Sequence, residues 1–173
     1  MKPKLPLFIA IGLLFAILGL YLGVNRLAPA TAQATATAGL LTQTWPDAQG
    51  RPQKLSQWEN KPLIVNFWAT WCAPCVQEMP ELSALQTELV AKDIQLIGIG
   101  IDSATNIAEF SSKYKISYPL YVAGIAGTEL SRSFGNQAGG LPFTVLIGRD
   151  GKVKKTYLGR LKMQELRADL ALI

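Results

Sequence analysis

Two cysteines separated by two residues, in the run Trp71-Cys72-Ala73-Pro74-Cys75, constrain this 173-residue chain more than any other feature. They are its only cysteines, and it contains no histidine. A disulfide-stapled scaffold needs more cysteine pairs, and a zinc site needs four ligands. The sequence therefore predicts no metal site, and it excludes Cys–His pairs and imidazole acid–base chemistry.

The cysteine pair lies between a predicted buried strand and a predicted helix. Residues 62–69 form an apolar run rich in β-branched and aromatic side chains, as in a central strand. The helix that follows is indicated by helical spacing of Cys75, Met79, Leu82, Leu85 and Leu89. Unpaired N–H groups and a partial positive charge at its start stabilise a thiolate at Cys72. We expect Cys72 to be the exposed attacking sulfur and Cys75 the resolving thiol.

Two other readings of the pair are weaker. Half a zinc site has no residues to complete it, because a second cysteine pair or a histidine is missing. An inert structural disulfide is possible in principle, but so small a ring constrains little chain entropy and tends to be reducible. Pro74, which needs no N–H at a helix start, stiffens the loop between the cysteines. Redox chemistry is therefore the favoured interpretation.

The N-terminal segment has the composition of a membrane anchor. Residues 5–24 are apolar and uncharged, and a helix of that length spans roughly 30 Å, the thickness of a hydrocarbon core. Lys2 and Lys4 precede the run, and Arg26 alone follows closely. The positive-inside bias then places the N-terminus in the cytoplasm and the body across the membrane. We expect residues 1–27 to be a single-pass anchor.

A cleaved signal peptide is the alternative, because small residues at 28–30 and 32–34 resemble cleavage sites. The apolar run is longer than the core of an ordinary signal peptide, which favours a retained anchor. Residues 28–38 are rich in alanine and threonine and carry no charge, which predicts a flexible linker. Of the 17 basic residues three precede residue 39, whereas all 12 acidic ones follow it. The body is nearly neutral, so nucleic acid is not an expected partner.

Residues 39–173 predict alternating strands and helices around one core. A hairpin is expected from 40–45 and 52–55 around a turn at Asp47–Gly50, and strands at 62–69, 94–101, 119–122, 143–147 and 152–157. Helices are expected after Cys75, around 107–114, as a turn at 130–134, and over 163–173. This order indicates a mixed sheet covered on both faces.

The motif and its surroundings resemble a known family. The run NFWATWCAPC, Pro80 five residues after Cys75, and Gly140-Leu141-Pro142 are similar to a thioredoxin-fold active site. The chain most resembles the membrane-anchored TlpA/ResA-like branch of exported thiol–disulfide oxidoreductases. This implies an α/β thioredoxin-like fold over 39–173, with a central mixed sheet flanked by helices, an N-terminal β-hairpin and a TlpA-like insertion between Ile101 and Phe143.

The resemblance also assigns site residues. The Leu141–Pro142 bond would be cis, with the Leu141 backbone opposite Cys72, where the family pairs with its substrate's extended chain. Trp71 would offer an apolar docking face, and Ala73 and Pro74 between the cysteines would complete the substrate-binding surface.

Two further polar residues, the acid Glu78 and the amide Asn66, lie near the cysteine pair in the sequence. Glu78 matches an acid of ResA-like proteins; if partly buried it would have a raised pKa and could exchange protons with the thiols. Its alternative is a solvated glutamate that complements the helix dipole. Asn66 stands where thioredoxin carries a buried acid, and an amide cannot manage a proton.

The implied function is that of an extracytoplasmic disulfide reductase with no cofactor beyond its redox-active disulfide. It would lie on the periplasmic side of the inner (cytoplasmic) membrane, take electrons from a membrane thiol-transfer protein, and act on disulfide-bearing exported proteins such as apocytochrome c. The absence of a charged residue between the cysteines favours reduction over oxidation. An oxidase or isomerase, and a tethered binding module without turnover, remain alternatives. A peroxidase would need threonine at Ala69, and a copper carrier would need histidine.

Overall fold

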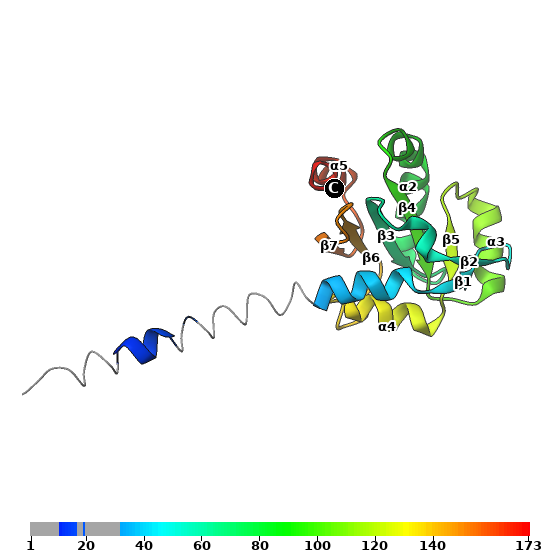
Figure 1. Cartoon of the computed structure of the whole chain (residues 1–173). Helices are drawn as coiled ribbons and strands as arrows, with labels where there is room; N and C mark the ends of the chain where they lie inside the picture. The colour runs from blue at the N-terminus through cyan, green and yellow to red at the C-terminus, as the bar shows by residue number, and fades with distance from the viewer. Residues whose placement is uncertain (1–10, 17–18, 20–31) are drawn as a thin grey trace, which may run out of the picture.

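A computed structural model describes residues 11–16, 19 and 32–173 of the protein. The predicted anchor over residues 1–27 therefore lies mostly outside the described residues. Among the residues that are described, no helix has both the length and the apolar character needed to cross a bilayer. Residues 32–173 form the folded body of the molecule (Figure 1).

The body is organised around a five-stranded sheet in the order β5-β4-β3-β6-β7. Its strands are β3 (Leu63–Trp68), β4 (Gln95–Gly100), β5 (Leu120–Val122), β6 (Phe143–Ile147) and β7 (Val153–Leu158). Strands β3, β4 and β5 are parallel, whereas β6 is antiparallel to β3 and β7 to β6. The predicted mixed sheet is confirmed. All six residues of β3 are buried, as expected of a central strand covered on both faces.

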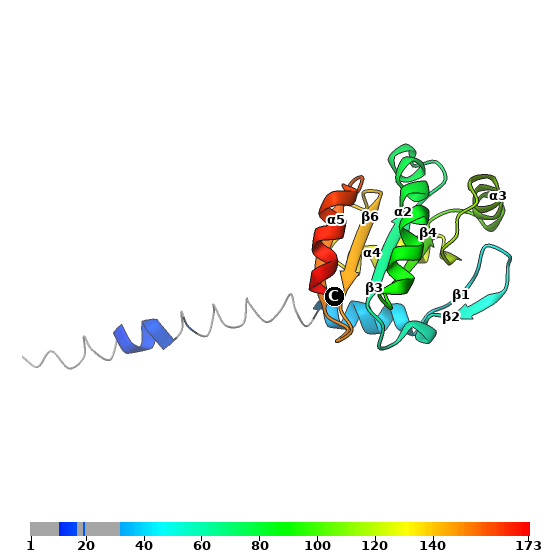
Figure 2. The same ribbon diagram turned by 90° about the horizontal axis from the view of Figure 1, so that it is seen from above.

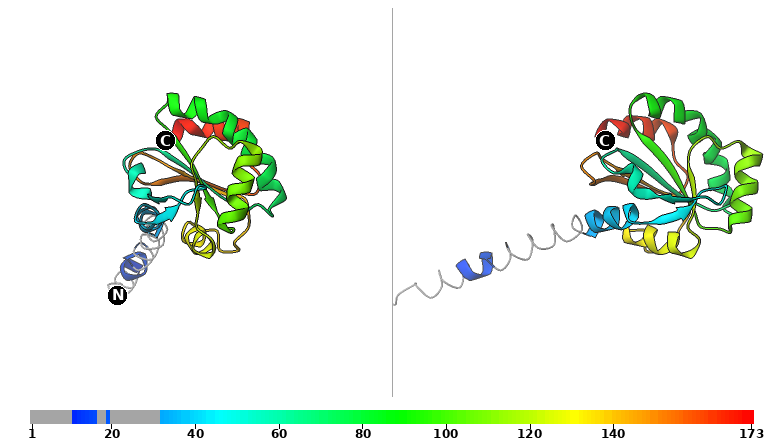
Figure 3. Two further views of the ribbon diagram at one scale, coloured as in Figure 1. Left: turned by 90° about the vertical axis from the view of Figure 1, so that its right-hand side faces the viewer. Right: turned by 45° about the vertical axis from the view of Figure 1, so that its right-hand side comes forward.

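Helices cover both faces of this sheet (Figure 3). One face carries α2 (Ala73–Ala91), α3 (Ala104–Tyr114) and α5 (Met163–Asp169), and the other carries α4 (Ile125–Ser133) and a helical segment, residues 32–41. Because side chains alternate along a strand, Ile64 and Trp68 of β3 belong to the core under α2, while Val65 and Phe67 belong to the core on the other side. The described residues also include the 3₁₀ turns η1 (Leu55–Trp58) and η2 (Leu170–Leu172).

The prediction of a flexible linker over residues 28–38 is wrong for residues 32–38, which are helical. Alanine is the strongest helix former, and Ala36 and Leu40, four residues apart, lie on one face of the helix. Ala36 is 4% exposed and Leu40 is fully buried, both in the core on the α4 side of the sheet. Tertiary packing of these two side chains therefore makes the segment part of the domain.

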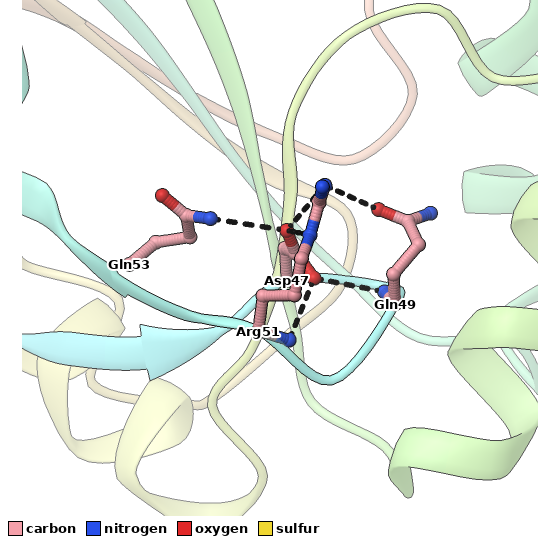
Figure 4. A network of polar contacts seen from close by, with 4 residues as sticks. All are labelled: Asp47, Gln49, Arg51 and Gln53. Atoms are coloured by element: carbon pink, nitrogen blue, oxygen red, sulfur yellow. Dashed lines mark hydrogen bonds and ion pairs between the residues drawn. The ribbon is translucent and has the colours of Figure 1, made fainter.

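The predicted hairpin exists but starts later than expected, because Leu40 and Leu41 belong to the helix. Its strands are β1 (Thr44–Pro46) and β2 (Pro52–Lys54). Asp47 holds the turn: its carboxylate accepts hydrogen bonds from the backbone N–H groups of Gln49 and Arg51, each at 2.9 Å, and pairs with the Arg51 guanidinium (Figure 4). A bridge from Asp47 to Tyr121 joins this hairpin to β5.

The interval between Ile101 and Phe143 contains α3, β5 and α4. Helix α4 is longer than the predicted turn at 130–134. Its first half includes Gly127. Glycine is a weak helix former, so the sequence pattern does not indicate a helix there. The space at Gly127 is tight, because a Cβ there would lie 3.0 Å from the Ile101 side chain and the neighbouring side chains would have to shift. Close packing of α4 on the sheet explains the glycine.

The helical segment at residues 32–41 and the start of α2 lie at opposite ends of the sheet (Figure 2). Residues 34, 37 and 38 of the helical segment border a hollow together with residues 148–151 of the β6–β7 turn. That turn lies beside the start of β3, since Ile147 pairs with Leu63. Cys72 follows the opposite end of β3. The chain therefore enters the domain at one end of the sheet and presents the cysteine pair at the other.

Candidate active site

The cysteine pair caps the first turn of α2. Cys72 is the N-cap residue, its sulfur accepts a hydrogen bond from the Cys75 N–H at 3.3 Å, and Pro74 occupies the first turn, where no N–H is needed. The two sulfurs form a disulfide. Cys72 is 5% exposed and Cys75 is fully buried. In this oxidised form Cys72 is thus less exposed than predicted, because its side chain joins the core cluster beneath α2.

The residues around the disulfide are more open. Trp71 is 70% exposed, and Ala73 and Pro74 are exposed as well. Trp68, by contrast, is fully buried with its ring 4.9 Å from that of Phe110, so it serves the core. Trp71 leaves a large apolar surface beside the sulfurs, as a docking face requires.

The loop before β6 lies at the same end of the sheet as the cysteine pair, since Phe143 pairs with Phe67 near the end of β3. The Leu141–Pro142 peptide bond is cis, the state that the resemblance implies. The Pro142 carbonyl accepts a hydrogen bond from the Gly159 N–H at 2.8 Å, which fixes the loop to the end of β7. Among the described residues, the N–H and carbonyl of Leu141 form no hydrogen bond. An extended partner strand could therefore pair with this residue.

A buried carboxyl group lies one turn into α2 from Cys75. Glu78 is fully buried, so the solvated alternative is wrong. Its Oε1 accepts a hydrogen bond from the Asn66 amide and its Oε2 from the Leu161 N–H, both at 2.8 Å. Burial raises the pKa of Glu78, and the two hydrogen bonds offset only part of that effect. Because residues three apart lie on the same helix face, Glu78 and Cys75 share the face of α2 that meets the sheet.

Sequence reasoning treated Asn66 and Glu78 separately and missed that they touch. Asn66 is fully buried in β3, and its Nδ2 also donates to the Thr144 hydroxyl of β6 at 3.0 Å. An inward-facing polar residue in an otherwise apolar strand was the available signal, because a buried amide requires partners. The amide is therefore a hydrogen-bond donor to the buried acid.

A second group that the sequence did not reveal holds the loop before Cys72. The Asp102 carboxylate, after β4, accepts hydrogen bonds from the backbone N–H and the hydroxyl of Thr70, and from Ser103 and Asn106 at the start of α3. Burial opposes ionisation of Asp102, but these hydrogen bonds prevail and lower its pKa. Thr70 and Asp102 are 32 residues apart, and only the parallel pairing of β3 and β4 brings them together.

Comparison with known proteins supports the same type of site. The Redoxin family model matches residues 26–170. The chain is similar to the thiol-disulfide oxidoreductase ResA of Geobacillus thermodenitrificans, with 28% identity over 162 residues, 91% of this chain and 88% of the relative. It is 33% identical to ResA of Bacillus anthracis over 126 residues, 72% of this chain and 70% of the relative.

Solved structures share the fold. A secreted disulfide oxidoreductase of Mycobacterium tuberculosis superposes with a TM-score of 0.66 at 20% identity, covering 78% of this chain and 98% of that one. A thiol:disulfide interchange protein of the thioredoxin family from Chlorobium tepidum gives a TM-score of 0.64 at 25% identity, covering 75% of this chain and 91% of that one. The thioredoxin-like expectation is confirmed.

Proposed function

Because this chain belongs to the ResA-like thiol-disulfide oxidoreductases of the Redoxin family, we propose that it works as a reductase of disulfides in exported proteins. The observation that carries the direction is the buried Glu78 carboxyl one turn from Cys75. When ionised, it disfavours a thiolate in the same low-dielectric core. Strong oxidants stabilise their reduced, thiolate form. A dithiol in which a nearby negative charge weakens this stabilisation gives up its electrons more readily.

The reaction follows from the two sulfurs. In the reduced protein the Cys72 thiolate attacks one sulfur of a partner's disulfide, which forms a mixed disulfide and releases the partner's other sulfur as a thiolate. Cys75 then loses its proton and attacks the Cys72 sulfur. This restores the Cys72–Cys75 disulfide and frees the second partner thiol. Two electrons pass to the partner. We propose that Glu78 accepts the one proton that Cys75 releases, and the partner's two thiolates take their protons from Glu78 and from water.

A donor must then reduce the protein again. We infer a membrane thiol-transfer protein as that donor, because the apolar run at residues 5–24 and the lysines before it suit a cytoplasmic-membrane anchor with the domain on the periplasmic side. Substrates would be disulfide-bearing exported proteins. Apocytochrome c, whose haem-attachment cysteines must be reduced, is a candidate among them.

The test measures reduction potential and turnover on the full chain in detergent. A potential close to the thioredoxin value of about −270 mV, with catalysed reduction of insulin, supports the proposal. A potential near about −120 mV, typical of strong oxidants, would favour the oxidase or isomerase alternative. Cys72→Ser should abolish turnover and Cys75→Ser should trap a mixed disulfide. A wild-type protein that binds partners without reducing them would instead be a tethered binding module.

A further inference from the structure

One buried side chain clamps the residue just before the Leu141–Pro142 bond. Asn136, 3% exposed, lies in the loop after α4. Its Nδ2 donates to the Gly140 carbonyl at 2.9 Å, and its Oδ1 accepts from the Gly140 N–H at 3.1 Å. A single side-chain amide thus pairs both backbone groups of Gly140, as a neighbouring strand residue would.

The backbone at this point needs an external restraint. Gly139, with a φ of +66°, and Gly140 form the most permissive kind of dipeptide, because neither has a Cβ. A Cβ at Gly140 would lie 3.0 Å from the Leu158 side chain, which would have to move slightly to admit it. Local conformational preference therefore does not fix the residue that leads into Leu141.

Asn136 is itself anchored to α4. Its backbone N–H donates to the Ser131 carbonyl at 3.1 Å, and its Nδ2 lies 3.4 Å from the Ser131 hydroxyl. Ser131 is fully buried, and its hydroxyl donates to the Thr128 carbonyl at 2.9 Å. A continuous set of hydrogen bonds therefore connects a packed helix with Gly140.

We propose that Asn136 is a positioning residue that sets the main chain of Leu141 for an extended polypeptide carrying the target disulfide. The inference rests on the proposed function and narrows its substrate class. The N–H and carbonyl of Leu141 have no partner within the described part of the chain, and a partner strand can use them only if the preceding peptide is held in place. A small-molecule disulfide reaches Cys72 without that pairing. Loss of the Asn136 hydrogen bonds should therefore impair the reduction of polypeptide disulfides and leave small-molecule disulfides unaffected.

The experiment compares two substrates on the full chain reduced with dithiothreitol. Asn136→Ala removes both bonds to Gly140 and should raise KM for insulin about tenfold, the effect of losing one or two hydrogen bonds. The rate with 5,5′-dithiobis(2-nitrobenzoate) should change less than twofold. Gln137→Ala is the matched control, because this neighbouring amide is exposed and bonds only the Arg132 carbonyl. It should leave both substrates unaffected.

A second measurement covers the case in which Asn136→Ala folds poorly. Asn136→Ser shortens the side chain, and hydrogen exchange should show faster exchange at the Gly140 amide while β6 amides stay protected. An unchanged KM for insulin, or equal losses with both substrates, overturns the proposal. If wild-type protein reduces no insulin, the proposed function fails. Identical hydrogen exchange of the Gly140 amide in wild type and Asn136→Ser would separately contradict the positioning role of Asn136.

Discussion

The side-chain amide of Asn66 lies 2.8 Å from the carboxylate of Glu78, and both side chains are completely buried. An amide from the central strand thus supports an acid on the helix that carries the disulfide. The contact couples β3 and α2 directly beneath the redox site. It also makes the protonation of Glu78 sensitive to changes at position 66.

Asn66→Asp should make stability strongly pH-dependent. Two adjacent buried carboxyls cannot both ionise, so the pKa of one is raised further. A raised pKa in the folded state gives stability that is present at low pH and lost as pH rises through that value. Urea unfolding should show little loss near pH 4, the unfolded value of the Asp carboxyl, and a loss of about 3 kcal/mol at pH 8. Asn66→Leu is the control, and an equal loss for Asn66→Asp at both pH values would contradict this expectation.

Glu78→Gln should change the titration of the reduced thiols. Burial raises the pKa of Glu78, so its negative charge develops above the usual carboxyl range and opposes ionisation of Cys75. Without the charge, the pH midpoint for alkylation of Cys75 should fall by roughly one unit. Mass spectrometry after iodoacetamide pulses distinguishes Cys75 from Cys72. Glu81→Gln, at an exposed position of α2, should leave the curves in place. Identical curves for Glu78→Gln and wild type would remove Glu78 from the redox chemistry.

Asp102→Asn should loosen the loop that precedes the disulfide. The variant amide cannot accept all the hydrogen bonds that Thr70, Ser103 and Asn106 donate, which should cost about 1–3 kcal/mol at pH 7. Because hydrogen bonds lower the pKa of Asp102, its stabilisation exists above the ordinary value of 3.8 and disappears as pH falls through the folded-state value. Guanidinium unfolding at pH 7 and at pH 3 measures the difference, with Glu109→Gln, at an exposed position of α3, as control. A deficit that stays constant with pH would assign the effect to something other than this carboxylate.

Gly39→Ala should stabilise the protein by about 0.5–1 kcal/mol, because alanine is the better helix former at this helical position. A Cβ there meets no atom within 4 Å, so packing does not oppose the change. Thermal unfolding followed by circular dichroism provides the measurement. Gly98→Ala is the opposite control: its Cβ would lie 2.5 Å from Leu120, which should destabilise the core. No effect of Gly39→Ala would indicate that the helix contributes nothing to stability.

The sequence predicted the elements whose cause is local. The apolar run at 62–69, the helical spacing after Cys75 and the turn at Asp47 all appear in the structure, because periodicity and turn chemistry act over a few residues. The helix over 32–41 does not follow from the sequence pattern, because a short alanine-rich segment becomes helical only when tertiary contacts offset the conformational entropy that it loses. The residues that make those contacts lie far away in the chain.

The same distinction applies to the site. The cysteine pair is visible as a motif, and the resemblance added Leu141, Pro142 and Glu78. The contacts of Asn66, Asp102 and Asn136 were not visible, because each depends on the register of strands or on the course of a loop. Such polar clamps carry no local signature beyond a polar residue in an apolar neighbourhood.

The chain enters the domain beside the β6–β7 turn, at the rim of the sheet opposite Cys72. The membrane anchor that we propose would therefore hold the domain from the side opposite the two sulfurs. With that anchor, a large partner protein could reach the sulfurs without colliding with the membrane.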